Sequence, residues 1–129
     1  KLSNEPLKTM SEVTHRLLKC IDYQSIKDIR KKNFNLLAEN LGEKNLLDID
    51  VGSVEVPMVF PFLSIRDDLH EILIQEKIYV ATYWPEVIKK VKTGSIEYRF
   101  SKNLVPLPID QRYGEKEMLI IADKVLQYV

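Results

Sequence analysis

Several residue types are scarce in this sequence, and each scarcity excludes a class of protein. Cys20 is the only cysteine, so no internal disulfide framework is possible, and the chain fits a reducing compartment. The four glycines stand apart from one another, so neither a P-loop nor a dinucleotide-binding fingerprint can form. The two histidines, His15 and His70, lie far apart without a metal-ligand spacing around them. We therefore expect no metal site.

An excess of one charge and long apolar runs are missing as well. The chain carries 19 basic and 19 acidic side chains, so its composition does not favour nucleic acid or an anionic membrane as a partner. The longest apolar runs fall well short of a bilayer span. The stretch from Leu2 to Lys8 is polar and has no apolar core of a signal peptide. These features predict a cytoplasmic protein.

The length of 129 residues is that of one domain, and 45% hydrophobic residues are enough for a moderate core. We expect a single domain over residues 1–129. The sequence opens with Lys1 rather than Met, which suggests a piece of a longer protein, although removal of a tag would leave the same start.

Apolar residues at a spacing of three and four positions predict five helices. Asp22 is a suitable N-cap for the second helix, and Gly42 is suited to the left-handed position that follows its last turn. We expect both N-terminal helices to pack on a sheet. The predicted helices are Thr9 to about Cys20, Asp22 to about Leu41, one that starts at Ser64 or Asp67, a short one capped by Ser95, and Glu115 to Tyr128.

Three stretches rich in β-branched and aromatic residues or fixed by proline predict strands: Val54 to Leu63, Ile78 to Trp84, and Leu104 to Pro108. Prolines in the first stretch place it at a sheet edge or put a bulge in it, and prolines in the third restrict pairing to one side. The strands are not adjacent in sequence, and helices lie between them. We therefore predict an α+β two-layer sandwich, with a small, mainly antiparallel sheet of three or four strands and helices packed on one face.

A polar loop, Asp110 to Tyr113, follows the third predicted strand and comes just before a helix N-terminus. This arrangement often presents side chains to a ligand. We expect Tyr83 and Trp84, at the end of the second strand, to rim a pocket beside Gln111 and Arg112. An arginine there can pair with a carboxylate or phosphate in bidentate fashion. The alternatives are a connector whose polar residues face water, and aromatic residues that serve the core or an interface.

No catalytic constellation is assembled in the sequence. The acidic residues around His70 are explained by a charged helix start, because the helix dipole stabilises acids there. Cys20 is expected to pack as a small hydrophobe. The basic cluster from Lys27 to Lys32 is expected to form the solvated face of its helix. We therefore predict no catalytic residue.

Three segments form a familiar pattern when they are read in order: Ile29 to Leu37, Ile78 to Pro85, and Leu107 to Tyr113 followed by Glu117 and Met118. Together they resemble the C-terminal small domain of DegT/DnrJ/EryC1/StrS-type aminotransferases. The Leu-Pro-x-x-x-x-Tyr stretch is the most specific part of this resemblance. Such proteins are fold type I enzymes that depend on pyridoxal phosphate, and many act on nucleotide-linked keto-sugars in the synthesis of surface polysaccharides or glycosylated metabolites.

The resemblance implies a division of labour. In such enzymes a large N-terminal domain holds pyridoxal phosphate and supplies the Schiff-base lysine. This chain has no such region, so it should hold no cofactor and be inactive alone. The small domain closes one side of the cleft and helps to bind the nucleotide-sugar and the amino-acid donor, and the parent is expected to be a homodimer. The substrate-binding positions that the resemblance implies are Tyr83, Trp84, Gln111 and Arg112.

An alternative class of function remains open. The chain could be a free-standing, non-catalytic binding or interaction module that derives from this small domain and uses a sheet edge or a helix face. An independent small enzyme that uses His70 or Cys20 is disfavoured, because neither residue has an activating partner in the sequence.

Overall fold

The structure is a computed structural model, and it describes residues 8–129. The expectation that the stretch from Leu2 to Lys8 contains no signal peptide lies outside the described residues, apart from Lys8.

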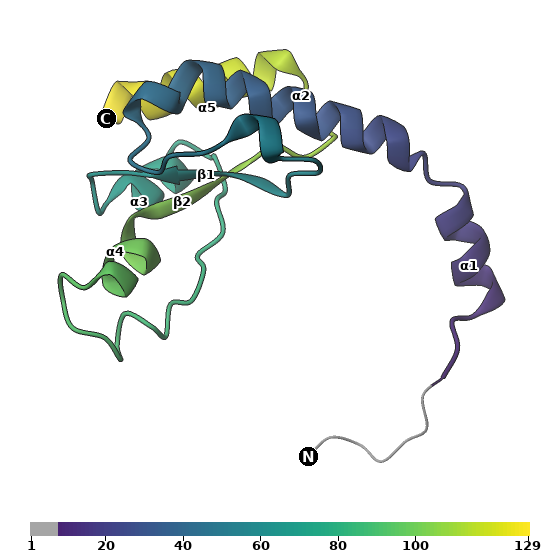
Figure 1. Cartoon of the computed structure of the whole chain (residues 1–129), viewed down its shortest axis with the longest axis horizontal. Coiled ribbons are helices and arrows are strands. Elements are labelled where there is room, and N and C mark those ends of the chain that lie inside the picture. Colours follow the sequence, from purple (N-terminus) through teal and green to yellow (C-terminus); the bar gives the residue numbers. More distant parts are fainter. Residues whose placement is uncertain (1–7) are drawn as a thin grey trace.

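The described chain is an α+β domain, as the sequence predicts (Figure 1). Two long helices lie side by side over a short antiparallel sheet, two shorter helices lie beside that sheet, and the first helix projects away from the body. The helices are α1 (Glu12–Lys19), α2 (Tyr23–Leu41), α3 (Leu69–Gln75), α4 (Ile96–Asn103) and α5 (Glu115–Tyr128), and the strands are β1 (Val59–Leu63) and β2 (Leu104–Pro108).

The strands β1 and β2 pair in an antiparallel register that places Pro61 directly opposite Pro106. Proline has no N–H, so this pair cannot be hydrogen-bonded, and the ladder bonds run through the residue pairs on either side. The prediction of three or four strands is wrong, because residues 8–129 contain two.

The outer edge of β2 explains why Ile78 to Trp84 does not become a strand. In β2 the backbone N and C=O groups of Leu104, Pro106 and Pro108 point toward this edge. Pro106 and Pro108 have no N–H to donate. The third, Leu104, donates its N–H to the carbonyl of Phe100 in α4. The segment from Ile78 to Trp84 has the composition of a strand, but this edge offers it no donor.

The outer edge of β1 is covered by a side chain. The Asn45 amide nitrogen donates to the carbonyl of Pro61 (2.9 Å), and its oxygen accepts from the N–H of Leu63 (2.8 Å). The N–H of Leu46 donates to the carbonyl of Leu63 (3.0 Å). Asn45 therefore makes the bonds that a neighbouring strand would make.

The core lies between the sheet and the helices. Phe34 of α2 packs edge-on against Phe60 of β1, with ring centroids 5.1 Å apart and an interplanar angle of 63°. A buried face of the sheet pairs Phe60 with Leu107 and Phe62 with Val105. The helices contribute Leu37, Leu41, Leu69, Leu73, Met118, Ile121, Ala122 and Val125 to this core.

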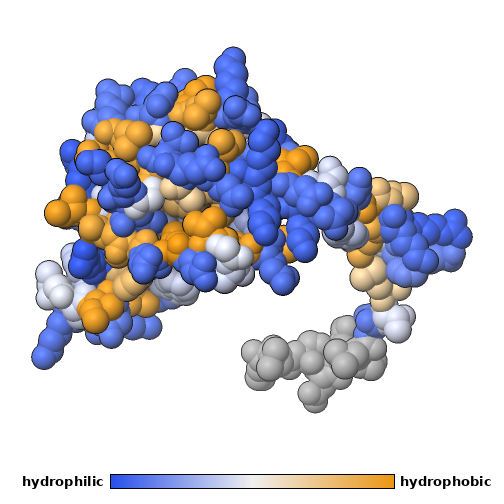
Figure 2. All heavy atoms as spheres, turned by 45° about the horizontal axis from the view of Figure 1, so that its top comes forward, coloured by the Kyte–Doolittle hydropathy of each residue, from blue (hydrophilic) through white to orange (hydrophobic). Residues whose placement is uncertain are grey.

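Helix α1 forms where the sequence predicts it, but the expectation that it packs on the sheet is wrong. The Ser11 hydroxyl caps it by accepting from the N–H of Thr14, and none of its residues is buried. Helix α2 is 19 residues long and is buried only from Asn33 onward, so α1 is attached beyond the edge of the body. The exposed apolar stripe of this arm consists of Met10, Val13, Leu17, Leu18 and Ile21 (Figure 2).

Local signals predict the ends of α2 only in part. The Asp22 carboxylate accepts from the N–H of Ser25 (3.0 Å), which confirms the predicted N-cap. The left-handed conformation predicted for Gly42 is wrong, since its φ is −55° and it opens a 3-10 turn, Gly42–Lys44. This tight turn brings Asn45 to the sheet edge.

The two C-terminal helices confirm the sequence prediction. Ser95 caps α4 by accepting from the N–H of Tyr98 (3.2 Å). Helix α5 spans the predicted residues, and its buried residues are Met118, Ile121, Ala122 and Val125. Val129, which follows the helix, is partly buried against the same core.

Helix α3 starts later than the sequence predicts. It begins after Asp68 rather than after Ser64 or Asp67, and the Asp68 carboxylate forms two hydrogen bonds with Arg66 instead of capping the helix. At its other end, Ile78 donates to the carbonyl of Leu73 and Lys77 to that of Ile74, which is a Schellman motif. Lys77 has a φ of 63°, in the left-handed region where glycine is the usual residue.

We predict that Lys77→Gly stabilises the chain. The left-handed conformation costs a residue with a Cβ roughly 1–2 kcal/mol, and part of this gain is lost to the greater freedom of glycine in the unfolded chain. The free energy of unfolding, measured by urea denaturation, should rise by about 0.5–1 kcal/mol. Lys77→Ala is the matched control: it removes the same charge but keeps the Cβ, so it should give no gain, and an equal gain would contradict the assignment.

Candidate functional site

The predicted polar loop, Asp110 to Tyr113, is a structured turn between β2 and α5. The carboxylate of Asp110 accepts from the N–H of Arg112 (3.0 Å), and the carbonyl of Asp110 accepts from the N–H of Tyr113 (3.0 Å). The residue before the turn, Ile109, is fully buried, and the residue after it, Gly114, donates its N–H to Glu117 in the first turn of α5 (2.9 Å). Both ends of the loop are therefore fixed.

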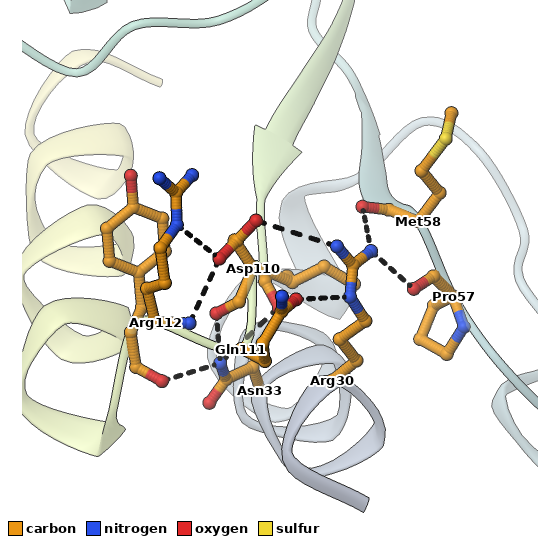
Figure 3. A network of polar contacts seen from close by, with 9 residues as sticks. Arg30, Asn33, Pro57, Met58, Asp110, Gln111 and Arg112 are labelled. Carbon is orange, nitrogen blue, oxygen red and sulfur yellow. Dashed lines mark hydrogen bonds and ion pairs between the residues drawn. The ribbon is translucent and has the colours of Figure 1, made fainter. Parts of the chain in front are cut away.

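Arg30 of α2 ties this loop to the chain before β1 (Figure 3). Its Nε donates to the Gln111 side-chain oxygen (2.9 Å), and its Nη2 lies 3.5 Å from a carboxylate oxygen of Asp110. Its Nη1 donates to the carbonyls of Pro57 and Met58 at 3.4 and 3.3 Å. The Arg30 side chain is 20% exposed, so these bonds form in a partly desolvated place where they are stronger than in water.

Asn33, one turn further along α2, supports the loop from beneath. It is buried, and its amide nitrogen lies within hydrogen-bond distance of the carbonyls of Ile109 (3.4 Å), Asp110 (3.3 Å) and Tyr113 (3.0 Å). These carbonyls belong to a turn and have no strand partner, and an unsatisfied buried carbonyl is costly. The Asn33 amide therefore stabilises the backbone of the loop itself.

Arg112 is the side chain that this network presents to solvent. Its Nε donates to the Asp110 carboxylate (2.7 Å), and 77% of the side chain is exposed. Within residues 8–129 its two Nη groups form no hydrogen bond or ion pair, and they point away from Arg30 (Figure 3). The bonds from Arg112 and the charge of Arg30 lower the pKa of Asp110, while Asp110 raises the pKa of Arg112. The loop therefore presents an exposed guanidinium that is bonded through Nε and has an open Nη edge.

Tyr83 and Trp84 lie elsewhere. Their rings are 5.5 Å apart, and Tyr83 lines a hollow that Leu104, the first residue of β2, also lines. The polar loop follows the other end of β2, and a strand of five residues spans roughly 15 Å. The structure brings Gln111 and Arg112 together in one cluster and the two aromatic residues together in another, but it does not bring the two clusters together.

Arg30 and Asn33 are site residues that sequence reasoning missed. The pattern of α2 assigned Arg30 to a solvated face, which is wrong because it is partly buried against the loop. Asn33 stands at helical spacing with the apolar residues Leu37 and Leu41 of α2, and a buried amide needs hydrogen-bond partners. That polar residue in an apolar stripe was the available signal that α2 supports a loop.

Across residues 8–129, no group of His, Cys, Asp and Glu side chains is arranged to hold a metal ion. In the same range no helix has the length and apolar character needed to cross a bilayer. No protein-family model, curated protein or solved structure matches this chain. The two clusters and the resemblance in sequence are therefore the features that bear on function.

We predict that Arg30→Met destabilises the chain by about 2 kcal/mol, the typical range for charged hydrogen bonds. The loss should appear in urea denaturation. Lys31→Met is the matched control, since Lys31 is exposed next to it on α2, and its effect should stay within about 0.5 kcal/mol. An equal loss in both variants would show that charge on α2, rather than the bonds to the loop, matters.

Asp110 should make stability depend on acid pH. Its pKa in the folded chain is lowered from 3.8, so its contribution is fully present above that value and is lost as pH falls through the folded pKa. Thermal melting of the wild-type chain and of Asp110→Asn should therefore differ most at neutral pH and converge below pH 3.8. A gap that stays constant over this range would contradict the role of the ionised carboxylate.

Proposed function

We propose that this chain is the C-terminal small domain of a pyridoxal-phosphate-dependent aminotransferase that acts on nucleotide-linked keto-sugars in the cytoplasm. One observation carries the proposal. Arg30 and Asn33 lie in the first of the resembling segments, Ile29 to Leu37, and both bind the third, Leu107 to Tyr113. Segments that are far apart in sequence and carry the resemblance together therefore form one structural unit.

The cofactor belongs to the parent enzyme. All lysines among residues 8–129 are exposed or only partly buried, which does not fit the enclosed site of a Schiff-base lysine. Pyridoxal phosphate would act as an electron sink for transfer of an amino group from an amino-acid donor, glutamate in this proposal, to the keto-sugar. The parent's large domain would hold it, and this chain alone would be inactive.

The role of this chain is to bind and orient substrate. Arg112 presents the free edge of its guanidinium beside Gln111, and such an edge matches a carboxylate or a phosphate group. Tyr83 and Trp84 would contact a different part of the substrate, because β2 separates the two clusters. A nucleotide-linked sugar is long enough to have separate groups at both places.

The exposed apolar stripe of α1 supports a partner that packs on this arm. Val13 and Leu17, four residues apart on α1, are 68% and 65% exposed. Exposed apolar surface of this kind marks an interaction site. In the proposed enzyme the large domain covers this stripe, and the parent is a homodimer.

The first test is the mass of the native polypeptide in source cells, detected with an antibody against this chain. A species much heavier than 15.1 kDa that carries the absorbance of pyridoxal phosphate is the expected result. A species of 15.1 kDa would overturn the proposal.

In the intact enzyme, Arg112→Met should raise the KM for one substrate by roughly 10- to 100-fold, since a hydrogen bond to a charged group contributes about 1.5–3 kcal/mol. The kcat should change little, because the contact is made equally before and during the reaction. Lys116→Met, an exposed residue on α5, is the control and should leave KM unchanged. An unchanged KM in Arg112→Met would show that the polar loop does not bind the substrate.

The second candidate is a free-standing interaction module that derives from this domain. The exposed stripe of α1 fits this candidate as well, because the body of the same chain leaves that stripe uncovered. In this case the native species has a mass of 15.1 kDa, and replacing Leu17 with Asp abolishes binding to its partner.

A further inference from the structure

A hollow of about 210 Å³ lies at the start of β2, at the opposite end of that strand from the polar loop. It is formed by α3 and the residues before it, by the irregular segment around Tyr83, and by the end of α4. Its volume is below the roughly 300 Å³ at which pockets for drug-sized ligands begin, so it suits one small ring.

The rim of this hollow offers both donors and acceptors. Asp67 and Glu71 contribute carboxylates, and Lys102 contributes an ammonium group. His70 and Thr82 share a hydrogen bond of 3.0 Å between Nε2 and Oγ1, and each keeps further hydrogen-bonding capacity. Such a mixture fits a ligand whose groups both donate and accept, as hydroxyl groups do.

An aromatic wall completes the hollow. Tyr83 lines it, and the Trp84 ring packs against Tyr83 at an interplanar angle of 52°. Trp84 has a φ of 51°, which is rare for a bulky residue and costs free energy. Its side chain remains 57% exposed, so burial of the indole does not account for this conformation. The face of an aromatic ring packs against apolar C–H groups of a ligand, and the polar groups at the edge of that ligand stay free to form hydrogen bonds.

The charges of the rim decide between ligand classes. Two carboxylates, of Asp67 and Glu71, and one ammonium group, of Lys102, line the hollow, so a free anion is disfavoured. A metal ion is also disfavoured, since no suitable group of ligands exists among residues 8–129. A neutral ring with an apolar face and several hydroxyl groups satisfies the rim and the aromatic wall together.

We propose that this hollow binds a neutral pyranose ring. Tyr83 covers the C–H face of the ring, Glu71 accepts from its hydroxyl groups, and Lys102 and His70 donate to its oxygens. The inference deepens the proposed function and rests on it only for the identification of this ring as the sugar part of the substrate.

Trp84 provides the readout, because it is the only tryptophan in the chain. Methyl glucopyranoside, a neutral pyranose, should change its fluorescence in a saturable manner. Glycerol, an acyclic polyol, and inorganic phosphate should produce no saturable change. A saturable change with phosphate, or no saturable change with the pyranoside, would overturn the inference.

Matched variants locate the binding. Glu71→Gln and Thr82→Val keep the shape of the side chain. Glu71→Gln replaces the carboxylate that accepts from the ring, and Thr82→Val removes the hydroxyl that is hydrogen-bonded to His70, a donor to the ring. Each should weaken pyranoside binding about 5- to 10-fold. The controls Glu86→Gln and Thr93→Val alter exposed residues outside the lining and should bind as the wild-type chain does. Circular dichroism checks that all four variants fold. If both Glu71→Gln and Thr82→Val bind the pyranoside with wild-type affinity, the ring does not bind in this hollow.

Failure of this inference is distinguishable from failure of the proposed function. Pyranoside binding by a protein whose native mass is 15.1 kDa would overturn the aminotransferase proposal and leave the sugar site intact. No pyranoside binding in a chain that belongs to a heavier enzyme with bound cofactor would overturn the sugar site alone.

Discussion

The pairing of β1 with β2 depends on the helices that cover it, because an isolated two-stranded sheet is marginally stable in water. Phe60 and Leu107 face each other across the ladder and are 1% and 0% exposed. The buried stripes of α2 and α5 pack on that same face of the sheet. Sheet and helices must therefore form together, and the position of the polar loop at the end of β2 follows from that packing.

The polar loop shows how a small core fixes a surface residue. Ile109 is part of the core, and its neighbour Asp110 is bonded on both sides by arginine. The Asn33 amide donates to the backbone carbonyls of Ile109 and Tyr113, at the two ends of the loop. The loop backbone that carries Arg112 is therefore ordered before any ligand arrives, and a segment that is already ordered loses less conformational entropy on binding.

The sequence predicted those elements whose causes are local. Asp22 and Ser95 were correct N-caps, because a cap involves residues three positions apart. The failures have distant causes. Whether Ile78 to Trp84 forms a strand depends on donors at the edge of β2, and the role of Arg30 depends on partners 27 to 81 positions away. For α1, the apolar stripe predicts that another surface packs on the helix, but it does not show whether that surface belongs to this chain or to a partner.

The Asn45 side chain has a consequence for self-association. A strand edge with free N–H and C=O groups is a template to which another molecule can add a strand, and such addition starts aggregation. Asn45 occupies the donor of Leu63 and the acceptor of Pro61 on β1, while prolines remove the donors of β2. Both edges of this minimal sheet are thereby protected, so the chain can expose the apolar arm of α1 without also offering a site for amyloid-like growth.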